Sequence, residues 1–477
     1  MISPRIRVEP SSAELIEGFG RIRRAMHLPE EFPQKVIKEA SVASEKDPSA
    51  GPGRAPRLDI EFVTIDPPGS MDLDQAYFGA KVEGGFHVSY AIADLGYFVQ
   101  PDGPLALEAM ARGKTLYSPD LRTPLYPTSI SEGAASLLPD QVRPAILWSF
   151  DLNGRGEVER FNVERSVVKS GRQMTYAEVQ KEIDGGSASD SLKVLRKVGK
   201  LRQRLEEERG GVNLRLPDQE VHPSAQGFEL VYRSELEVER WNSQISLMTG
   251  MAAAKLMLEA QVGLVRTLPA PQPETIEMLR RSAEALGLNW QLDITYQQFI
   301  RTLDSQAPAQ AAFLVLTRSL FQGVKYTYFN GPAPDNVAHH AIAAPYAHVT
   351  APLRRMADRL TNELAILLSA KQEPPQWLLE SLAEAPDIMK VADHRDRELD
   401  SRIVDFVEAN ALSHLVGEVF EGVIVQSGKE GGMVQLRDPA VLGPCEGAGL
   451  PLGHRIQVRL TEANPATSRI RFTPTTV

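Results

Sequence analysis

A change of pattern along the chain, from strands to helices and back to strands, constrains the fold most. Residues 57–170 carry short runs of β-branched and aromatic residues, whereas residues 175–415 mainly follow the spacing of amphipathic helices. The last 60 residues return to short apolar runs at regular intervals, separated by Gly-rich turns. Strands followed by helices favour an α+β domain over a doubly wound one, and the terminal pattern is typical of a small closed β-barrel.

Turn residues place the hairpins and helices within this pattern. Two hairpins are expected, one with a Gly-Gly turn at residues 84–85 and one with an Asn-Gly turn at residues 153–154. Helices are predicted over residues 175–184, 190–211, 235–261, 273–287 and 352–370. The expected domains are a short helical segment and linker at 1–55, a domain of mixed sheet and helices at 56–415, and a five-stranded barrel at 416–477.

Composition and charge narrow the class of protein. The chain has 477 residues, 42% hydrophobic and 24% charged, as a globular protein of several domains would have. Its single cysteine, Cys445, cannot form an internal disulfide, and no Cys/His cluster suggests zinc. We expect no membrane span and no signal peptide, and hence a cytoplasmic protein. The net charge of −10 counts against a protein that coats nucleic acid, but not against an enzyme with a local basic channel.

Residues 64–76, TIDPPGSMDLDQA, gather three carboxylates around a Pro-Pro-Gly turn. Asp66 ends one predicted strand, and Asp72 and Asp74 precede the next. A solvated loop is the ordinary interpretation of such a turn. Like charges this close nevertheless raise one another's pKa unless a cation intervenes, and Mg²⁺ prefers oxygen ligands. The stretch is therefore a candidate metal site.

A second constellation is HVTAPLRRMAD at residues 348–358. Thr350 is a suitable N-cap and the proline two residues later suits a first helical turn, which would place Arg354 and Arg355 in that turn. Cations there oppose the helix dipole, whereas a phosphate would be favoured and would be bound by arginine. An ion pair from Arg354 to Asp358, one turn on, explains one arginine equally well.

Together these stretches resemble the ribonuclease II (RNB) family of exoribonucleases. TIDPPGSMDLDQA and HVTAPLRRMAD resemble its acidic signature and its Arg-Arg helix start. Residues 90–99 (YAIADLGYFV), 112–127 (RGKTLYSPDLRTPLYP) and 170–179 (SGRQMTYAEV) resemble three further motifs, and all five occur in the order of the family. The terminal barrel is similar to the S1-type OB-fold that closes these proteins. The resemblance covers about residues 57–475.

The resemblance implies a processive 3′→5′ exoribonuclease that acts as a monomer. It would hydrolyse single-stranded RNA to nucleoside 5′-monophosphates with Mg²⁺ or Mn²⁺. The implied metal positions are the four side chains of the acidic signature: Asp66, Asp72, Asp74 and Gln75. The implied catalytic residues are Asp74, Tyr176 near the scissile phosphate, and Arg354 on that phosphate. The implied substrate contacts are Tyr117, which would stack near the 3′ end, Thr350 and Arg355.

Local sequence also allows plainer interpretations of the two tyrosines. Tyr176 is equally an ordinary aromatic at a helix start, and a half-buried position is the commoner place for a tyrosine such as Tyr117. Asp400 matches a later acidic position of the family only loosely.

Three departures from the family pattern matter. Gln75 stands at the fourth acidic position and carries no charge, and Ser243-Gln244 stands where many relatives show an acidic pair. About 50 helix-like residues take the place of the two N-terminal cold-shock barrels of bacterial members. No aromatic in residues 212–221 matches the second base-stacking residue of the family.

Two other functions compete with the nuclease. A protein of the same fold that lost catalysis through Gln75 would bind single-stranded RNA without cutting it. An unrelated Mg²⁺-dependent enzyme, for example a glycosyltransferase that uses Asp72 and Asp74 as a DxD motif, would need alternating βα units. The helical middle of the chain does not offer them, and three spaced carboxylates beside an Arg-Arg pair favour the nuclease.

Overall fold

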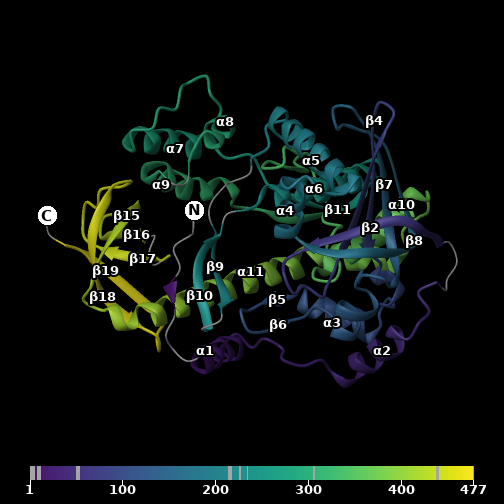
Figure 1. Ribbon diagram of the computed structural model, residues 1–477, viewed down its shortest axis with the longest axis horizontal. Helices are drawn as coiled ribbons and strands as arrows, with labels where there is room; N and C mark the ends of the chain where they lie inside the picture. The colour runs from purple at the N-terminus through teal and green to yellow at the C-terminus, as the bar shows by residue number, and fades with distance from the viewer. Residues whose placement is uncertain are drawn as a thin grey trace.

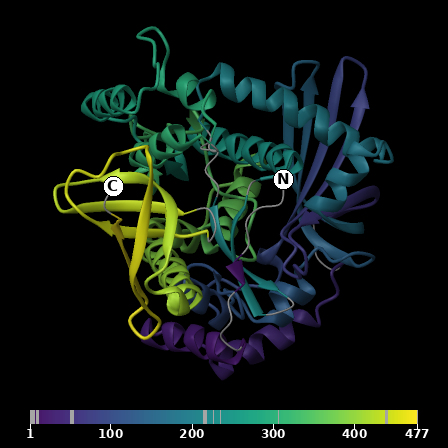
Figure 2. The same cartoon turned by 60° about the vertical axis from the view of Figure 1, so that its left-hand side comes forward.

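Two β-barrels lie at opposite ends of the molecule, with helices between them (Figures 1 and 2). The computed structural model describes residues 6–7, 12–49, 54–212, 218–224, 227–233, 235–304, 307–436 and 440–475. The mixed content of sheet and helix, and the terminal closed barrel, confirm the predicted α+β class.

The first barrel is a mixed sheet of five strands in the order β2-β3-β4-β7-β8. Its strands are β2 Ala55–Asp66, β3 Gln75–Val82, β4 Gly85–Ala93, β7 Val142–Asn153 and β8 Val158–Thr175. Strand β2 lies parallel to β8, and the other neighbours are antiparallel. Both predicted hairpins are confirmed, but Val82 pairs with Gly85, so the first turn is Glu83-Gly84 with Gly84 at φ 77°. Trp148, Tyr77 and Tyr90 are almost completely buried in its core.

Most of the α-helices follow the first barrel in the chain, as the sequence predicts. The α-helices are α1 Ser12–Ala25, α2 Gln34–Ser44, α3 Pro104–Arg112, α4 Tyr176–Asp184, α5 Asp190–Glu208, α6 Glu237–Glu259, α7 Pro273–Ala285, α8 Tyr296–Arg301, α9 Pro308–Leu316, α10 Met356–Ser369 and α11 Gln376–Leu412. Shorter helical turns are Leu95–Tyr97, Ile130–Ala134, Thr317–Phe321 and Ser413–Leu415. No helix in the described part of the chain is long and apolar enough to cross a membrane.

The second barrel closes in the order β15-β16-β17-β19-β18, which confirms the expected five-stranded barrel. Its strands are β15 Val419–Ser427, β16 Gly431–Leu436, β17 Leu442–Glu446, β18 Arg455–Asn464 and β19 Arg469–Pro474. Helices α7, α8 and α9 share an apolar cluster with this barrel. Helix α1 packs on α11, where the rings of Phe19 and Phe406 meet edge to face at 5.9 Å. The expected helical N-terminal segment is thus attached to the body of the protein.

Several small sheets were not predicted. They are β1 Ile6–Arg7 with β10 Gly227–Arg233 and β9 Asp218–Ser224, β5 Leu116–Tyr117 with β6 Arg122–Thr123, β11 Val262–Thr267 with β12 Lys325–Asn330, and β13 Ala338–His339 with β14 Ala344–Pro345. The β9–β10 hairpin interrupts a region that we expected to be mainly helical. Half of the aromatic-free stretch at 212–221, namely 213–217, lies outside the described residues.

Candidate active site

The three predicted carboxylates lie at the end of β2, which carries Asp66, and in the loop before β3, which carries Asp72 and Asp74. A turn follows Asp66, in which Ser70 N–H donates to the oxygen of Pro67 at 3.2 Å. Leu73 is completely buried, and its N–H donates to Ser136 Oγ at 2.9 Å. Ser136 Oγ in turn donates to the main-chain oxygen of Met71 at 2.6 Å. The acidic residues that flank Leu73 are therefore fixed by a segment that the sequence did not single out.

The predicted start of the helix at Thr350 is wrong. Helix α10 begins at Met356, and Arg355 is its N-cap with an extended backbone at φ −134° and ψ 122°. The preceding turn is held from outside: Ala351 N–H donates to Asp358 Oδ2 at 2.8 Å, and Leu353 N–H donates to Asp74 Oδ1 at 2.7 Å. Two carboxylates thus take the main-chain donors, so the chain has no need of a side-chain N-cap at Thr350.

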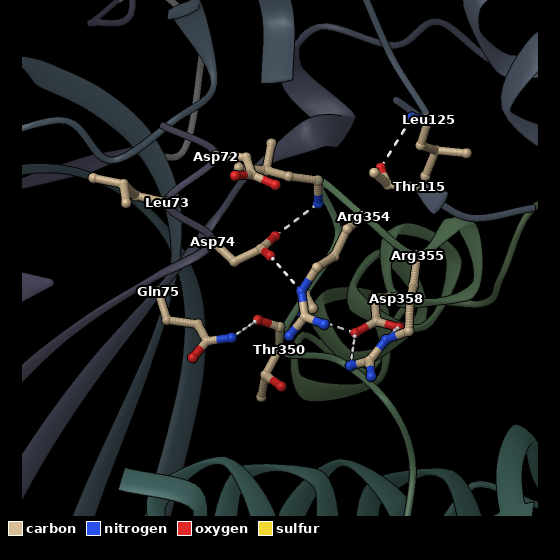
Figure 3. Close-up of polar contacts among 12 residues, drawn as sticks. Asp72, Leu73, Asp74, Gln75, Thr115, Leu125, Thr350, Arg354, Arg355 and Asp358 are labelled. Carbon is tan, nitrogen blue, oxygen red and sulfur yellow. Dashed lines mark hydrogen bonds and ion pairs between the residues drawn. The ribbon is translucent and has the colours of Figure 1, made fainter. Parts of the chain in front are cut away.

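Asp74 is the contact between the two constellations (Figure 3). Besides the bond to Leu353, its Oδ2 accepts from Arg354 Nε at 3.2 Å. The Asp74 side chain is 5% exposed, whereas that of Arg354 is 43% exposed. The residues lie 280 positions apart in the chain, and the fold brings them together. Arg354 therefore has one edge on a buried carboxylate and the rest of its guanidinium towards solvent.

Arg355 faces a different carboxylate. Its Nε and Nη2 donate to the two oxygens of Asp358 at 2.9 Å and 2.8 Å, and the Asp358 side chain has no exposed surface. The ion pair to Asp358 that the sequence left open for Arg354 is made by Arg355 instead. Thr350 is also buried, at 4% exposure. Both residues lie beside Arg354 with little exposed surface, and the expected contact of Arg355 and Thr350 with substrate stays a prediction.

Asp72 is held by two residues of the 112–127 motif. Its Oδ2 accepts from the hydroxyl of Tyr117 at 3.1 Å, and its Oδ1 accepts from Arg122 Nη1 at 2.7 Å. Tyr117 remains 45% exposed, so its ring is open to a ligand beside the carboxylate. Arg122 lies within the 112–127 motif, but the sequence alone did not indicate its contact with Asp72.

Asp66 is the least compensated of the three carboxylates. Its Oδ2 is buried and has no hydrogen-bond partner among the described residues. Burial and the charge of Asp72 raise the pKa of Asp66 to about 7, against the opposing effect of Arg354. Burial raises the pKa of Asp74 to about 7 as well, although Arg354 and the Leu353 N–H lower it. Burial of Asp66 and Asp74 thus outweighs the effect of Arg354 on their pKa values.

Tyr176 lies beside Asp66 at the start of α4. Thr175 caps this helix in a capping box with Glu178, which fixes the first helical turn. Burial and then the charge of Asp66 raise the pKa of the Tyr176 phenol, and a hydrogen bond to Asn242 on α6 partly opposes them. Tyr176 therefore keeps its proton at neutral pH.

Gln75 does not point towards the carboxylates. Its Nε2 donates to the main-chain oxygen of Thr350 at 2.5 Å (Figure 3). Its Oε1 accepts from the hydroxyl of Tyr90 at 2.7 Å. Tyr90 also bonds Ser246 Oγ on α6 at 2.8 Å. The side chain expected at a metal position thus joins three elements around the site.

The number of carboxylates that lie together decides whether these residues fit a divalent cation. In the described part of the chain, no three His, Cys, Asp or Glu side chains form a group that could hold a metal ion. Mg²⁺ is commonly held by one or two carboxylates with water and substrate phosphate, so a larger group is not required. The unpaired oxygen of Asp66 and its neighbour Asp72 fit such an ion. The four-residue ligand set stays a prediction, and so does the loose match of Asp400, which is exposed on α11.

The chain matches two protein-family models and several known proteins. The RNB domain model matches residues 57–368, and the model of the RNase II-type exonuclease C-terminal S1 domain matches residues 418–475. Ribonuclease R of Escherichia coli is 24% identical to this chain over an alignment of 510 residues. The alignment covers 94% of this chain and 61% of that protein. The human exosome complex exonuclease RRP44 is 28% identical over 333 residues, covering 66% of this chain and 34% of that protein. The chain therefore spans about three fifths of the length of that ribonuclease R and about one third of the length of RRP44.

Solved structures show the same fold. Mycoplasma genitalium RNase R in complex with ribose methylated single-stranded RNA gives a TM-score of 0.86 at 19% identity, covering 97% of this chain and 78% of that chain. Yeast Ssd1, described as a pseudonuclease, gives a TM-score of 0.70 at 14% identity. That match covers 95% of this chain and 57% of the Ssd1 chain. The fold therefore occurs both in a ribonuclease and in a pseudonuclease.

Proposed function

The chain belongs to the family of proteins that carry an RNB domain, and on this premise we propose that it is a processive 3′→5′ exoribonuclease. Its substrate is single-stranded RNA, its products are nucleoside 5′-monophosphates, and its cofactor is Mg²⁺ or Mn²⁺. One observation carries the proposal: the half-exposed Arg354 is paired with the buried Asp74, beside Asp66 and Asp72.

Each residue has a role that follows from its placement. Arg354 binds Asp74 through Nε alone among the described residues, so its two terminal nitrogens are available to phosphate oxygens. There they stabilise the charge that builds up as water attacks phosphorus. Tyr176 stays protonated beside Asp66 and donates a hydrogen bond to the phosphate.

Asp66 and Asp72 would hold the divalent ion, which supplies positive charge at the phosphate and lowers the pKa of bound water. Tyr117 keeps Asp72 oriented through its hydroxyl, while its exposed ring stacks on the terminal base. The second barrel matches an S1 domain and would add surface for the RNA upstream of the site.

The direct test follows the length of 5′-labelled single-stranded RNA incubated with the protein and Mg²⁺. Asp74→Asn is compared with Asp59→Asn, which changes an exposed aspartate on β2. We expect the parent protein and Asp59→Asn to shorten the RNA to a small limit product with release of 5′-monophosphates, and Asp74→Asn to leave it intact.

RNA that shifts in a gel but stays intact with the parent protein would contradict the proposal. That result would favour the alternative, a catalytically weak or inactive single-stranded RNA-binding protein of this fold. Internal cuts without 5′-monophosphates would instead identify an endonuclease.

A further inference from the structure

The hairpin of β5 and β6 holds Asp72 but is too short to keep its own position. It has only two residue pairs, and the pair next to the turn is Tyr117 with Arg122, the two residues that bond Asp72. Its turn, residues 118–121, is closed by one main-chain hydrogen bond of 2.9 Å. An isolated two-stranded hairpin is at best marginally stable in water. The contacts of this hairpin with the rest of the chain therefore decide where Tyr117 and Arg122 lie.

The base of the hairpin is attached to the active site and to the N-terminal helix. The Thr115 N–H, just before β5, donates to the main-chain oxygen of Arg354 at 3.0 Å. The buried Leu116 of β5 belongs to the same apolar cluster as Leu15 and Phe19 of α1. One end of the hairpin is thus fixed by the turn that carries Arg354, and its tip has to be fixed separately.

Helix α1 lies beside the hairpin (Figure 1) and holds its tip. Arg23, in the last turn of α1, donates from Nη1 and Nη2 to the two carboxylate oxygens of Asp120 at 2.6 Å and 2.8 Å. Both side chains are buried, at 7% and 9% exposure. A turn aspartate is ordinarily a solvated residue. Here two parallel bonds to a guanidinium fix the direction of the hairpin tip as well as its distance from α1.

Stability alone is a weak explanation of this ion pair. Two apolar side chains of similar volume often serve stability as well as a buried pair of opposite charges does. A two-pronged ion pair differs from an apolar contact in that it defines one orientation. The orientation defined here is that of the hairpin whose last pair holds Asp72.

We propose that α1, acting through Arg23 and Asp120, positions Asp72 for the metal ion and the ring of Tyr117 for the RNA. Arg23 is a positioning residue, because it acts through the hairpin and touches neither the ion nor the RNA. The inference rests on the proposed function, which gives Asp72 and Tyr117 their roles. It assigns a task to the N-terminal segment, which stands where bacterial members of the family carry cold-shock barrels.

The test measures Mn²⁺ binding to the RNA-free full chain by isothermal titration calorimetry. The part of the binding heat that Asp72→Asn removes is assigned to the site. Asp120→Asn breaks the ion pair. The double variant Arg23→Met/Asp120→Leu replaces the pair by apolar side chains, which should restore the stability that Asp120→Asn loses.

Two controls separate positioning from stability. Arg24→Met removes the exposed neighbouring arginine of α1. Leu279→Ala leaves a cavity under α7, in the cluster shared with the second barrel, and so destabilises the protein away from the hairpin. Urea unfolding of every variant measures how much stability each has lost.

We expect the Mn²⁺ affinity of the site to fall about tenfold in Asp120→Asn and in the apolar double variant, as when a residue that orients a metal ligand is lost. The Mg²⁺ concentration at half-maximal RNA hydrolysis should rise in parallel. Arg24→Met and Leu279→Ala should bind Mn²⁺ as the parent does. Affinity that recovers together with stability in the double variant would show that the ion pair is only structural and would overturn the inference. So would unchanged or tighter Mn²⁺ binding in Asp120→Asn.

Failure of the proposed function would give a different result. A parent protein that binds Mn²⁺ at the site but leaves RNA intact would contradict the nuclease, while the Mn²⁺ titrations would still decide the role of Arg23. A parent protein that hydrolyses RNA, with variants of Arg23 and Asp120 that bind Mn²⁺ as tightly as it does, would overturn the positioning role alone.

Discussion

The side-chain amide of Gln75 donates to the main-chain oxygen of Thr350, 275 positions later in the chain, at 2.5 Å. Thr350 begins the turn that presents the Leu353 N–H and Arg354 to Asp74. The other end of the amide accepts from Tyr90. Gln75 therefore links β3, the strand after the acidic loop, to the turn that carries Arg354.

A carboxylate at position 75 should remove the hydrogen bond between β3 and the turn at Thr350. Gln75→Glu keeps the length of the side chain but loses the donor and sets a negative charge against a carbonyl oxygen. We expect a loss of about 1–3 kcal/mol in the free energy of unfolding, and slower RNA hydrolysis at saturating Mg²⁺. Urea unfolding and a Mg²⁺ titration of the rate measure the two effects.

The control is Gln372→Glu, which makes the same change at an exposed glutamine after α10. Gln75→Glu or Gln75→Asp could instead lower the Mg²⁺ concentration at half-maximal rate and raise the rate. Position 75 would then hold a metal ligand rather than a structural link to the turn at Thr350.

Replacing Arg354 and replacing Arg355 by alanine should have different effects on stability and on RNA hydrolysis. Arg355→Ala leaves the fully buried Asp358 without its cation, and loss of one partner of a buried pair typically costs about 3–5 kcal/mol. Arg354→Ala removes a side chain that is 43% exposed. It also takes the cation from buried Asp74, but Asp74 keeps the Leu353 N–H as a donor and its raised pKa lets it take up a proton, so the fold should lose less than with Arg355→Ala. Hydrolysis should nevertheless slow at least ~100-fold, as when a charge-stabilising donor is removed from an active site.

Urea unfolding and single-turnover hydrolysis of the two variants separate these effects. An Arg354→Ala protein that unfolds as easily as Arg355→Ala would show that both arginines are structural. Arg354→Lys is a useful companion, since a point charge replaces the guanidinium fork without removing the cation.

Stability of the metal-free protein should fall as pH rises. The pKa values of Asp66 and Asp74 are raised to about 7 from 3.8, so the folded state holds more protons than the unfolded state between these values. The contribution of the two groups to stability is therefore lost progressively from about pH 4 to pH 7 and stays lost above it. The loss is on the order of a few kcal/mol.

Thermal unfolding of metal-free protein between pH 5 and pH 8 checks this sign. Asp74→Asn should flatten the profile, whereas Asp59→Asn should leave its slope unchanged. Added Mg²⁺ should stabilise the protein more at pH 8 than at pH 5, because protons compete for the same carboxylates. A profile that rises with pH in the parent but not in Asp74→Asn would contradict the raised pKa values.

Local patterns predicted the element types and the motifs, because periodicity and turn chemistry are properties of neighbouring residues. Both hairpins and the helix series at 175–287 lie within a few residues of their predicted places. The start of α10 was misplaced because Asp74 and Asp358 satisfy the turn from a distance, which outweighs a good local N-cap at Thr350.

Contacts across the fold were beyond local patterns. The motif order predicted that Asp74 and Arg354 share a site, but not that Arg122 holds Asp72. Nor does any property of Gln75 itself show that its partners lie 15 and 275 positions away. Strands β2 and β3 form one pair, Val63 with Tyr77. The sequence did not predict how far these two strands pair, because a residue pattern typical of a strand does not show which residues have a partner.

Tyr117 should contribute through its ring more than through its hydroxyl. The ring is 45% exposed and the hydroxyl donates to Asp72 at 3.1 Å. Tyr117→Phe keeps the stacking face, so RNA affinity should change less than threefold, whereas Tyr117→Ala should lose about 1–3 kcal/mol of binding, the usual value of one stacked base. Fluorescence anisotropy with a single-stranded oligonucleotide in Asp74→Asn background measures affinity without hydrolysis. Equal losses in the two variants would show that the bond to Asp72, and not stacking, is what holds the RNA.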